Sequence, residues 1–127
     1  MPDKVVDASV IAAMAFYEAS GDRASESIRG AELFAPDILP YELCSVALKK
    51  IKQEPVRAAE TVKRLELALS IGVTLVAPDW RRLLTLAAET GLSIYDAAYL
   101  QAARRLGCPL VTLDRRLERA FLSIERT

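Results

Sequence analysis

The chain alternates short apolar runs with longer amphipathic stretches. The runs KVV, VTLV and PLVTL are almost unbroken by polar residues, which is typical of strands that helices cover on both faces. The stretches between these runs have the apolar spacing of helices. Strands that alternate with helices are joined by right-handed crossovers. The pattern therefore predicts an α/β fold of three layers, α/β/α, with a central and mostly parallel sheet.

The apolar pattern, together with glycine and proline, sets the boundaries of these elements. Strands are predicted near residues 4–7, 32–35, 73–77 and 110–113. Helices are predicted near residues 8–19, 22–29, 39–53, 56–71, 79–90, 94–106 and 115–120. The five glycines lie where helical patterns end and are interpreted as helix C-caps. The final residues, FLSIERT, allow a further edge strand.

Length and composition favour a single domain over residues 1–127. No apolar run reaches the roughly 18 residues that span a bilayer, and the N-terminus lacks the layout of a signal peptide. We therefore expect a cytoplasmic protein with no membrane association. Cys44 and Cys108 belong to no CxxC pair, and the chain has no histidine to complete a zinc site. Both are expected to be small core residues in a reducing compartment.

The charges of the chain cancel, with 17 basic and 17 acidic residues. A neutral chain is unusual for a protein that binds nucleic acid without regard to sequence. Basic pairs nevertheless recur along the predicted helices, and each pair taken alone is most simply a solvated helix face. These pairs are Lys49–Lys50, Arg81–Arg82, Arg104–Arg105 and Arg115–Arg116.

Four carboxylates occur where carboxylates are rare. Asp7 and Asp114 end apolar runs, while Glu42 and Asp96 fall in the first turns of predicted helices. Ligands of open parallel sheets bind beyond the carboxyl ends of the strands, so we expect these four side chains to share one crevice. Their repulsion there calls for a divalent cation. Oxygen ligands without histidine or cysteine favour Mg²⁺ or Mn²⁺ over zinc.

Each of the four acids also has an ordinary structural explanation. Asp7 and Asp114 are suited to cap the helices that follow them. Asp96 stands three residues after Ser93, as in a capping box. Glu42 complements the positive end of its helix dipole.

Two features favour a site over simple capping. Asp96 shares a helix face with Leu100 and Ala103, so it projects from an apolar side of its helix. Asp7 follows valines in a strand that we expect to be central. Capping and ligand binding are also compatible, because a helix N-terminus keeps a carboxylate ionised.

The segments VVDASV, PYELCSVALKK, SIYDAAYLQAA and LVTLDRRL resemble, in order and spacing, the four acidic motifs of the PIN domain. The small size and the D-A-S opening resemble VapC-type toxins of toxin–antitoxin pairs. The resemblance extends from residue 5 to about residue 120. It implies metal-binding carboxylates at Asp7, Glu42, Asp96 and Asp114, and it implies endonucleolytic cleavage of RNA.

The resemblance also implies supporting hydroxyl groups at Ser9 and Thr112. Ser9 could instead cap the first helix, and Thr112 is an ordinary strand residue. One position departs from the family pattern, because many relatives carry a further acid where this chain has Arg116. This departure argues against a second tightly held metal, and Glu118 is a weak substitute.

The function expected from these features is that of a divalent-metal-dependent endoribonuclease, the toxin of a type II toxin–antitoxin pair. The resemblance implies a homodimer and a small antitoxin protein that occupies an apolar groove formed by the helices over residues 41–69. One alternative is a PIN-type nuclease of RNA processing without an antitoxin. Another is a phosphoacceptor receiver domain, which usually has paired acids after its first strand and a lysine after its last. Here Asp7 stands alone and Arg115 is no lysine.

Overall fold

The computed structural model describes residues 2–125 and contains one sheet of four parallel strands in the order β3-β2-β1-β4. In the central strand β1, Val5 pairs with Phe34 of β2 on one side and with Leu110 of β4 on the other. The four predicted strands are all present, although β4 ends two residues earlier than expected. They span Asp3–Val6 (β1), Glu32–Pro36 (β2), Val73–Val76 (β3) and Leu110–Val111 (β4).

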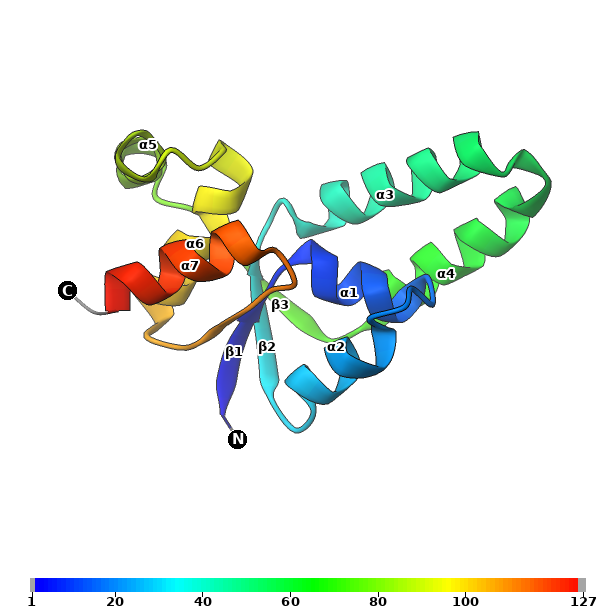
Figure 1. The fold of residues 1–127 in the computed structure, drawn as a ribbon, viewed down its shortest axis with the longest axis horizontal. Helices are drawn as coiled ribbons and strands as arrows, with labels where there is room; N and C mark the ends of the chain where they lie inside the picture. The colour runs from blue at the N-terminus through cyan, green and yellow to red at the C-terminus, as the bar shows by residue number, and fades with distance from the viewer. Residues whose placement is uncertain (1, 126–127) are drawn as a thin grey trace.

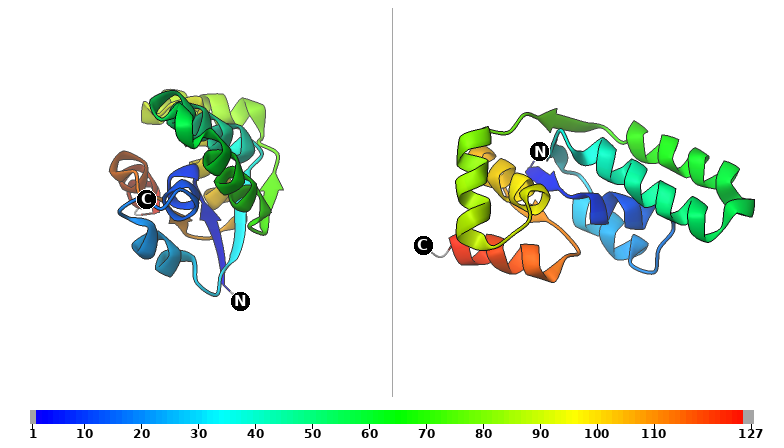
Figure 2. Two further views of the ribbon diagram at one scale, coloured as in Figure 1. Left: turned by 90° about the vertical axis from the view of Figure 1, so that its right-hand side faces the viewer. Right: turned by 90° about the horizontal axis from the view of Figure 1, so that it is seen from above.

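Helices cover both faces of this sheet. Figure 2 shows α1 to α4 on one side of the strands and α5 to α7 on the other, so the predicted three-layer architecture is confirmed. Residues 2–125 include no helix with the length and apolar character needed to cross a membrane. The helices span Ala8–Ala15 (α1), Gly21–Ile28 (α2), Leu39–Gln53 (α3), Ala58–Ser70 (α4), Trp80–Thr90 (α5), Ile94–Leu106 (α6) and Arg115–Glu125 (α7), with a 3₁₀ turn at Pro55–Arg57 (η1).

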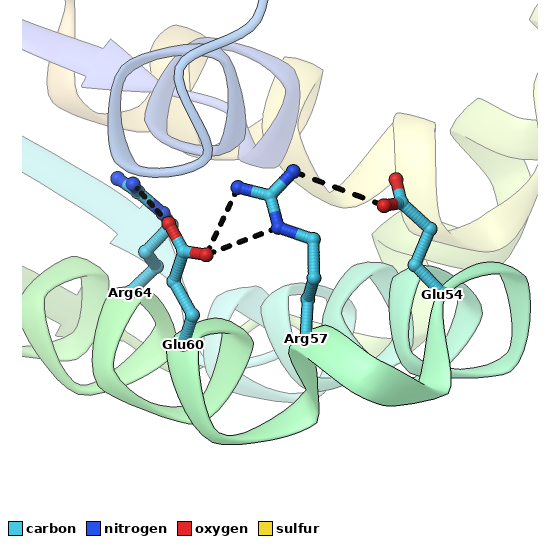
Figure 3. A network of polar contacts seen from close by, with 4 residues as sticks. All are labelled: Glu54, Arg57, Glu60 and Arg64. Carbon is cyan, nitrogen blue, oxygen red and sulfur yellow. Dashed lines mark hydrogen bonds and ion pairs between the residues drawn. The ribbon is translucent and has the colours of Figure 1, made fainter.

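Helices α3 and α4 form an antiparallel pair that projects well beyond the sheet (Figure 1). At the tip of this arm Arg57 bridges Glu54 and Glu60, with its Nη2 atom 2.9 Å from Glu60 Oε2 (Figure 3). Arg64 holds the other oxygen of Glu60 at 2.6 Å. These ion pairs are largely exposed and each contributes little to stability. They join the 3₁₀ turn to the first turns of α4.

The core is organised around α6. Residues 97–103 of this helix are all buried, because α6 contacts β1, β2 and β4 on one side and α5 and α7 on the other. The first turn of α6 is therefore held firmly at the edge of the sheet where the strands end. Any side chain in that turn, such as Asp96, has a fixed position relative to the strand ends.

The prediction of an edge strand at the C-terminus is wrong for residues 121–125, because these residues continue α7. Leu117 and Phe121 are both buried and stand four residues apart. That spacing puts both side chains on one face of the helix, against the core. The remaining residues of the segment, 126–127, lie outside the described part of the chain.

Two further expectations need correction. Cys108 is buried as predicted, but Cys44 is exposed. The buried face of α3 runs through Leu39, Leu43 and Ala47 at intervals of four residues, and Cys44 falls one position outside it. Among the glycines, Gly91 and Gly107 do close α5 and α6 in the left-handed conformation, whereas Gly21 begins α2 instead of ending a helix.

Candidate functional site

Asp7 is buried at the junction between β1 and α1, where it caps the helix. Its Oδ1 atom accepts hydrogen bonds from the backbone N–H of Ser9 at 3.0 Å, from the Ser9 hydroxyl at 2.5 Å and from the N–H of Val10 at 3.4 Å. Its Oδ2 atom accepts from the Thr112 hydroxyl at 2.6 Å. Both hydroxyl groups that the sequence singled out therefore contact Asp7.

The same two hydroxyls tie Asp7 to the loop that carries Asp114. The Ser9 hydroxyl accepts from the N–H of Leu113 at 3.0 Å, and the Thr112 hydroxyl accepts from the N–H of Asp114 at 2.9 Å. Each hydroxyl thus donates to the carboxylate and accepts from the loop. Asp114 is exposed and lies three residues beyond the end of β4, because this strand is shorter than predicted. Its Oδ1 atom accepts from the N–H groups of the residues two and three positions later, and so caps α7.

Glu42 is half-buried in the first turns of α3 and is held from inside the core. The hydroxyl of Tyr99 donates to Glu42 Oε1 at 2.6 Å. Tyr99 is buried in α6, one turn after Asp96. The sequence reasoning missed this residue. Its position could have indicated a role, because Tyr99 is on the face of α6 that carries Asp96 and a buried tyrosine hydroxyl usually has a polar partner.

Asp96 is half-buried in the first turn of α6, where its backbone N–H donates to the Ser93 hydroxyl at 3.1 Å. This contact is the Ser93 half of the predicted capping box. Ser93 caps the helix through its own oxygen, so the cap does not depend on the Asp96 carboxylate. The residue can therefore mark the start of α6 and still present a carboxylate at the edge of the sheet.

Burial raises the pKa values of Asp7, Glu42 and Asp96, and neighbouring charges add to this effect at Glu42 and Asp96. Burial raises the pKa of Asp7, against the hydrogen bonds that lower it. Burial also raises the pKa of Glu42, and the charges of Asp7 and Asp96 raise it further. The pKa of Asp96 is raised first by burial and then by the charge of Asp114. Repulsion from carboxylates on other elements therefore acts on Glu42 and on Asp96.

The arrangement is open. Within residues 2–125, no three side chains of aspartate, glutamate, histidine or cysteine come close enough together to hold a metal ion. The charges of the acids nevertheless act on one another, those of Asp7 and Asp96 on Glu42 and that of Asp114 on Asp96. Mg²⁺ usually retains several water molecules and binds proteins through one or two carboxylates. An open set of oxygen donors is chemically suited to such a hydrated dication.

A cleft of about 790 Å³ opens beside Glu42. It lies between α3, the start of α1 and the start of α6. Within residues 2–125, α3 lines this cleft and α4 does not, so the apolar groove expected over residues 41–69 stays a prediction. The cleft is lined by Ala8, Ser9, Ile38, Tyr41, Glu42, Ser45, Val46, Lys49 and Tyr95.

Comparison with known proteins identifies the fold. A model of the PIN domain family matches residues 4–121. The chain belongs to the PIN domain family. It is 33% identical over 122 residues to "Ribonuclease VapC3" of Pyrobaculum aerophilum, with 92% of this chain and 93% of the relative covered. The crystal structure of PAE2754 from Pyrobaculum aerophilum superposes with a TM-score of 0.75 at 29% identity, covering 94% of this chain and 86% of that one. The resemblance to VapC-type PIN domains is confirmed.

This PIN domain has a fixed cation beside its acids. The Arg116 side chain on α7 donates from Nη2 to the carbonyl oxygen of Gly91 at 2.8 Å. Its positive charge lowers the pKa of Asp96, against the larger effects of burial and Asp114. The position where a further acid was expected thus carries a guanidinium group next to the carboxylates.

We expect Tyr99→Phe to destabilise this PIN domain by about 1–2 kcal/mol. The substitution removes only the hydroxyl that donates to Glu42, which leaves a half-buried carboxylate without its donor. That hydrogen bond lowers the pKa of Glu42, so its loss should raise the pKa further. Urea unfolding at neutral pH measures the change. Tyr95→Phe, an exposed tyrosine of the same helix, is the matched control. Equal stability of Tyr99→Phe and the wild type would contradict the role of the buried contact.

Proposed function

We propose that the protein is a divalent-metal-dependent endoribonuclease of the cytoplasm, the toxin of a toxin–antitoxin pair. The observation that carries this proposal is the electrostatic coupling of four carboxylates at one edge of a PIN-domain sheet. The relative named "Ribonuclease VapC3" supports RNA as the substrate and a toxin as the class. The carboxylates alone would suit DNA equally well.

The proposed ligands of Mg²⁺ or Mn²⁺ are Asp7, Glu42, Asp96 and Asp114. Their oxygen atoms are hard donors, and a bound cation would relieve the repulsion among them in the folded protein. When bound, the metal supplies a Lewis acid that polarises a phosphate oxygen and lowers the pKa of a water molecule. The protein's contribution is to fix the donors, because Ser9 and Thr112 hold Asp7 and Tyr99 holds Glu42.

The chemical step proposed is attack of water on a phosphodiester. We assign the role of accepting the water proton to Asp96, because burial makes its carboxylate more basic than that of a solvated aspartate. The new P–O bond forms as the bond from phosphorus to the 3′-oxygen breaks, and the leaving 3′-oxygen takes a proton from solvent. The products are a 5′-phosphate and a 3′-hydroxyl. Arg116 lies beside Asp96 and offers its positive charge to the phosphate.

The direct test is incubation of the purified protein with total RNA, with and without Mg²⁺ or Mn²⁺. We expect internal cleavage only with the metal. End mapping should then find 5′-phosphates and 3′-hydroxyls on the fragments. Cleavage at an equal rate in excess EDTA would contradict metal dependence, and 2′,3′-cyclic phosphate ends would contradict attack by water.

Two protein partners are part of the proposal. A small antitoxin would cover apolar surface next to the acids and direct a basic side chain toward them, and co-purification with such a protein distinguishes a toxin from a nuclease of RNA processing. Leu48, Val62 and Leu67 are exposed on the α3–α4 arm and add to this apolar surface. A second copy of the chain is the other partner, and the exposed side chains of Leu75 and Trp80 are available for that contact.

A further inference from the structure

Two exposed tyrosines stand at the cleft beside the acids. Tyr41 is 79% exposed and Tyr95 is 59% exposed, and both line the 790 Å³ cleft together with Glu42. Each tyrosine directly precedes a site acid in the chain, Tyr41 before Glu42 and Tyr95 before Asp96. The two aromatic rings therefore line the same cleft as Glu42, and they come from two different helices.

The positions of these rings are fixed by rigid backbone. Tyr41 is in the first turn of α3, directly after Pro40, and Tyr95 is in the first turn of α6, which Ser93 caps. Both rings are exposed although they lie in helices and not in long loops. The other two tyrosines of the chain have structural partners, since the Tyr99 hydroxyl donates to Glu42 and the Tyr17 ring lies 3.9 Å from the Arg64 guanidinium carbon.

Four residues that line the cleft follow one another along α3. Glu42, Ser45, Val46 and Lys49 all line it and share one face of α3, at positions i, i+3, i+4 and i+7. Lys49 is therefore two helical turns, or about 10 Å, from Glu42. A ligand that lies along α3 would meet Tyr41 and Glu42 at one end, then Ser45 and Val46, and then the ammonium group of Lys49.

We infer that Tyr41 and Tyr95 bind unstacked bases of single-stranded RNA next to the phosphate that is cut. This inference rests on the proposed ribonuclease function. A nucleotide chain carries both phosphates and bases, and the cleft offers partners for both. One phosphate would lie near Glu42, the adjoining bases would stack on the rings of Tyr41 and Tyr95, and a further phosphate would reach Lys49. Aromatic side chains recognise single-stranded RNA by stacking on its bases. The bases of a duplex are already stacked inside it, so single-stranded RNA is the substrate class.

The test measures the affinity of a fluorescent single-stranded RNA by anisotropy, in an Asp7→Asn background with Mg²⁺, so that the RNA stays intact. Tyr41→Ala and Tyr95→Ala should each weaken binding by roughly 5- to 150-fold, the effect of losing one base–aromatic stack. Tyr41→Phe and Tyr95→Phe keep the rings and should bind nearly as tightly as the parent. Tyr17→Ala removes a ring that is 74% exposed but does not line the cleft, and it should bind like the parent.

A second arm replaces single nucleotides of the RNA by abasic sites. At the position that stacks on a ring, the abasic site should weaken binding to the parent but not to the matching alanine variant, because the partner of the base is already gone. The inference is overturned if the alanine variants bind RNA like Tyr17→Ala, or if every abasic site weakens all variants equally. It is also overturned if the alanine variants lose only affinity for a protein partner.

These outcomes are separable from failure of the proposed function. Cleavage is measured in parallel with protein that retains Asp7. If that protein binds RNA through the tyrosines but cuts none with Mg²⁺ or Mn²⁺, the nuclease proposal fails and the stacking site stands. If it cuts RNA and the alanine variants have unchanged KM, the nuclease proposal stands and the stacking site fails. Circular dichroism verifies the fold of each variant.

Discussion

Asparagine in place of Asp7 is expected to reduce RNA cleavage by at least about a thousandfold, which corresponds to roughly 4 kcal/mol of transition-state stabilisation. Asp7 is the most buried of the four acids, and the substitution removes its charge while preserving its shape. The amide oxygen can still accept from the N–H groups of Ser9 and Val10, so the cap of α1 is kept. The rate of cleavage of a fluorescent RNA with Mg²⁺ or Mn²⁺ measures the effect.

Asp79→Asn is the matched control for this substitution. Asp79 also caps a helix, because its side chain accepts from the N–H of Arg82 at the start of α5, but its charge is not among those that act on the site acids. The Asp79→Asn variant should cleave RNA at the wild-type rate. A native rate in Asp7→Asn, with an unchanged circular dichroism spectrum, would remove Asp7 from the site. Loss of activity in both variants would point to the caps instead of the carboxylate.

Much of this fold could be predicted from the sequence because its signals are local. A buried strand with helices on both faces requires a run of apolar residues, and an acid directly after such a run is conspicuous. Asp7 follows Val5 and Val6, both fully buried in the central strand. The same logic selected Asp114, although its strand ends earlier and the residue lies in the loop that leads into α7.

The contacts that orient the acids could not be predicted in the same way. Tyr99 and Glu42 are 57 residues apart, and Arg116 and Gly91 are 25 residues apart. Their meeting depends on how α6 lies against α3 and α7, and no local pattern specifies that packing. Likewise the sequence predicts that the acids face one edge of the sheet. How open their arrangement is depends on the tilt of the helices that carry them.

The polar groups of the site also explain why it can be both buried and charged. Each hydroxyl that donates to Asp7 also accepts from the loop before α7. The hydrogen bonds lower the pKa of Asp7 and partly offset the cost of burying its charge. This offset is incomplete, because the pKa values of Asp7, Glu42 and Asp96 all remain raised. The folded protein without metal therefore carries a cost in stability at neutral pH.

Asp96→Asn is expected to relieve part of that cost and to stabilise the metal-free protein at pH 7. The pKa of Asp96 is raised in the folded state, so the folded protein holds this proton more tightly than the unfolded chain does. The contribution of Asp96 to the free energy of unfolding therefore falls as the pH rises from the pKa of the unfolded state, near 3.8, through the raised pKa of the folded state. Asparagine is uncharged at every pH, and its advantage should be full at pH 7 and vanish as the pH falls below that window. Thermal unfolding in EDTA across this range measures the difference.

The same variant tests the link between repulsion and metal binding. Mg²⁺ or Mn²⁺ at ten times its Kd should stabilise the wild type by about 1.4 kcal/mol, because the cation binds only the folded state. Asp96→Asn should gain less, since it has lost one ligand and one repulsive charge. Glu60 at the arm tip has a pKa lowered by Arg64 and Arg57 and so has the opposite pH dependence, but it is common to both proteins and cancels in the comparison. A variant that is less stable than the wild type in EDTA at pH 7, yet responds equally to the cation, would show that Asp96 serves α6 and not a metal.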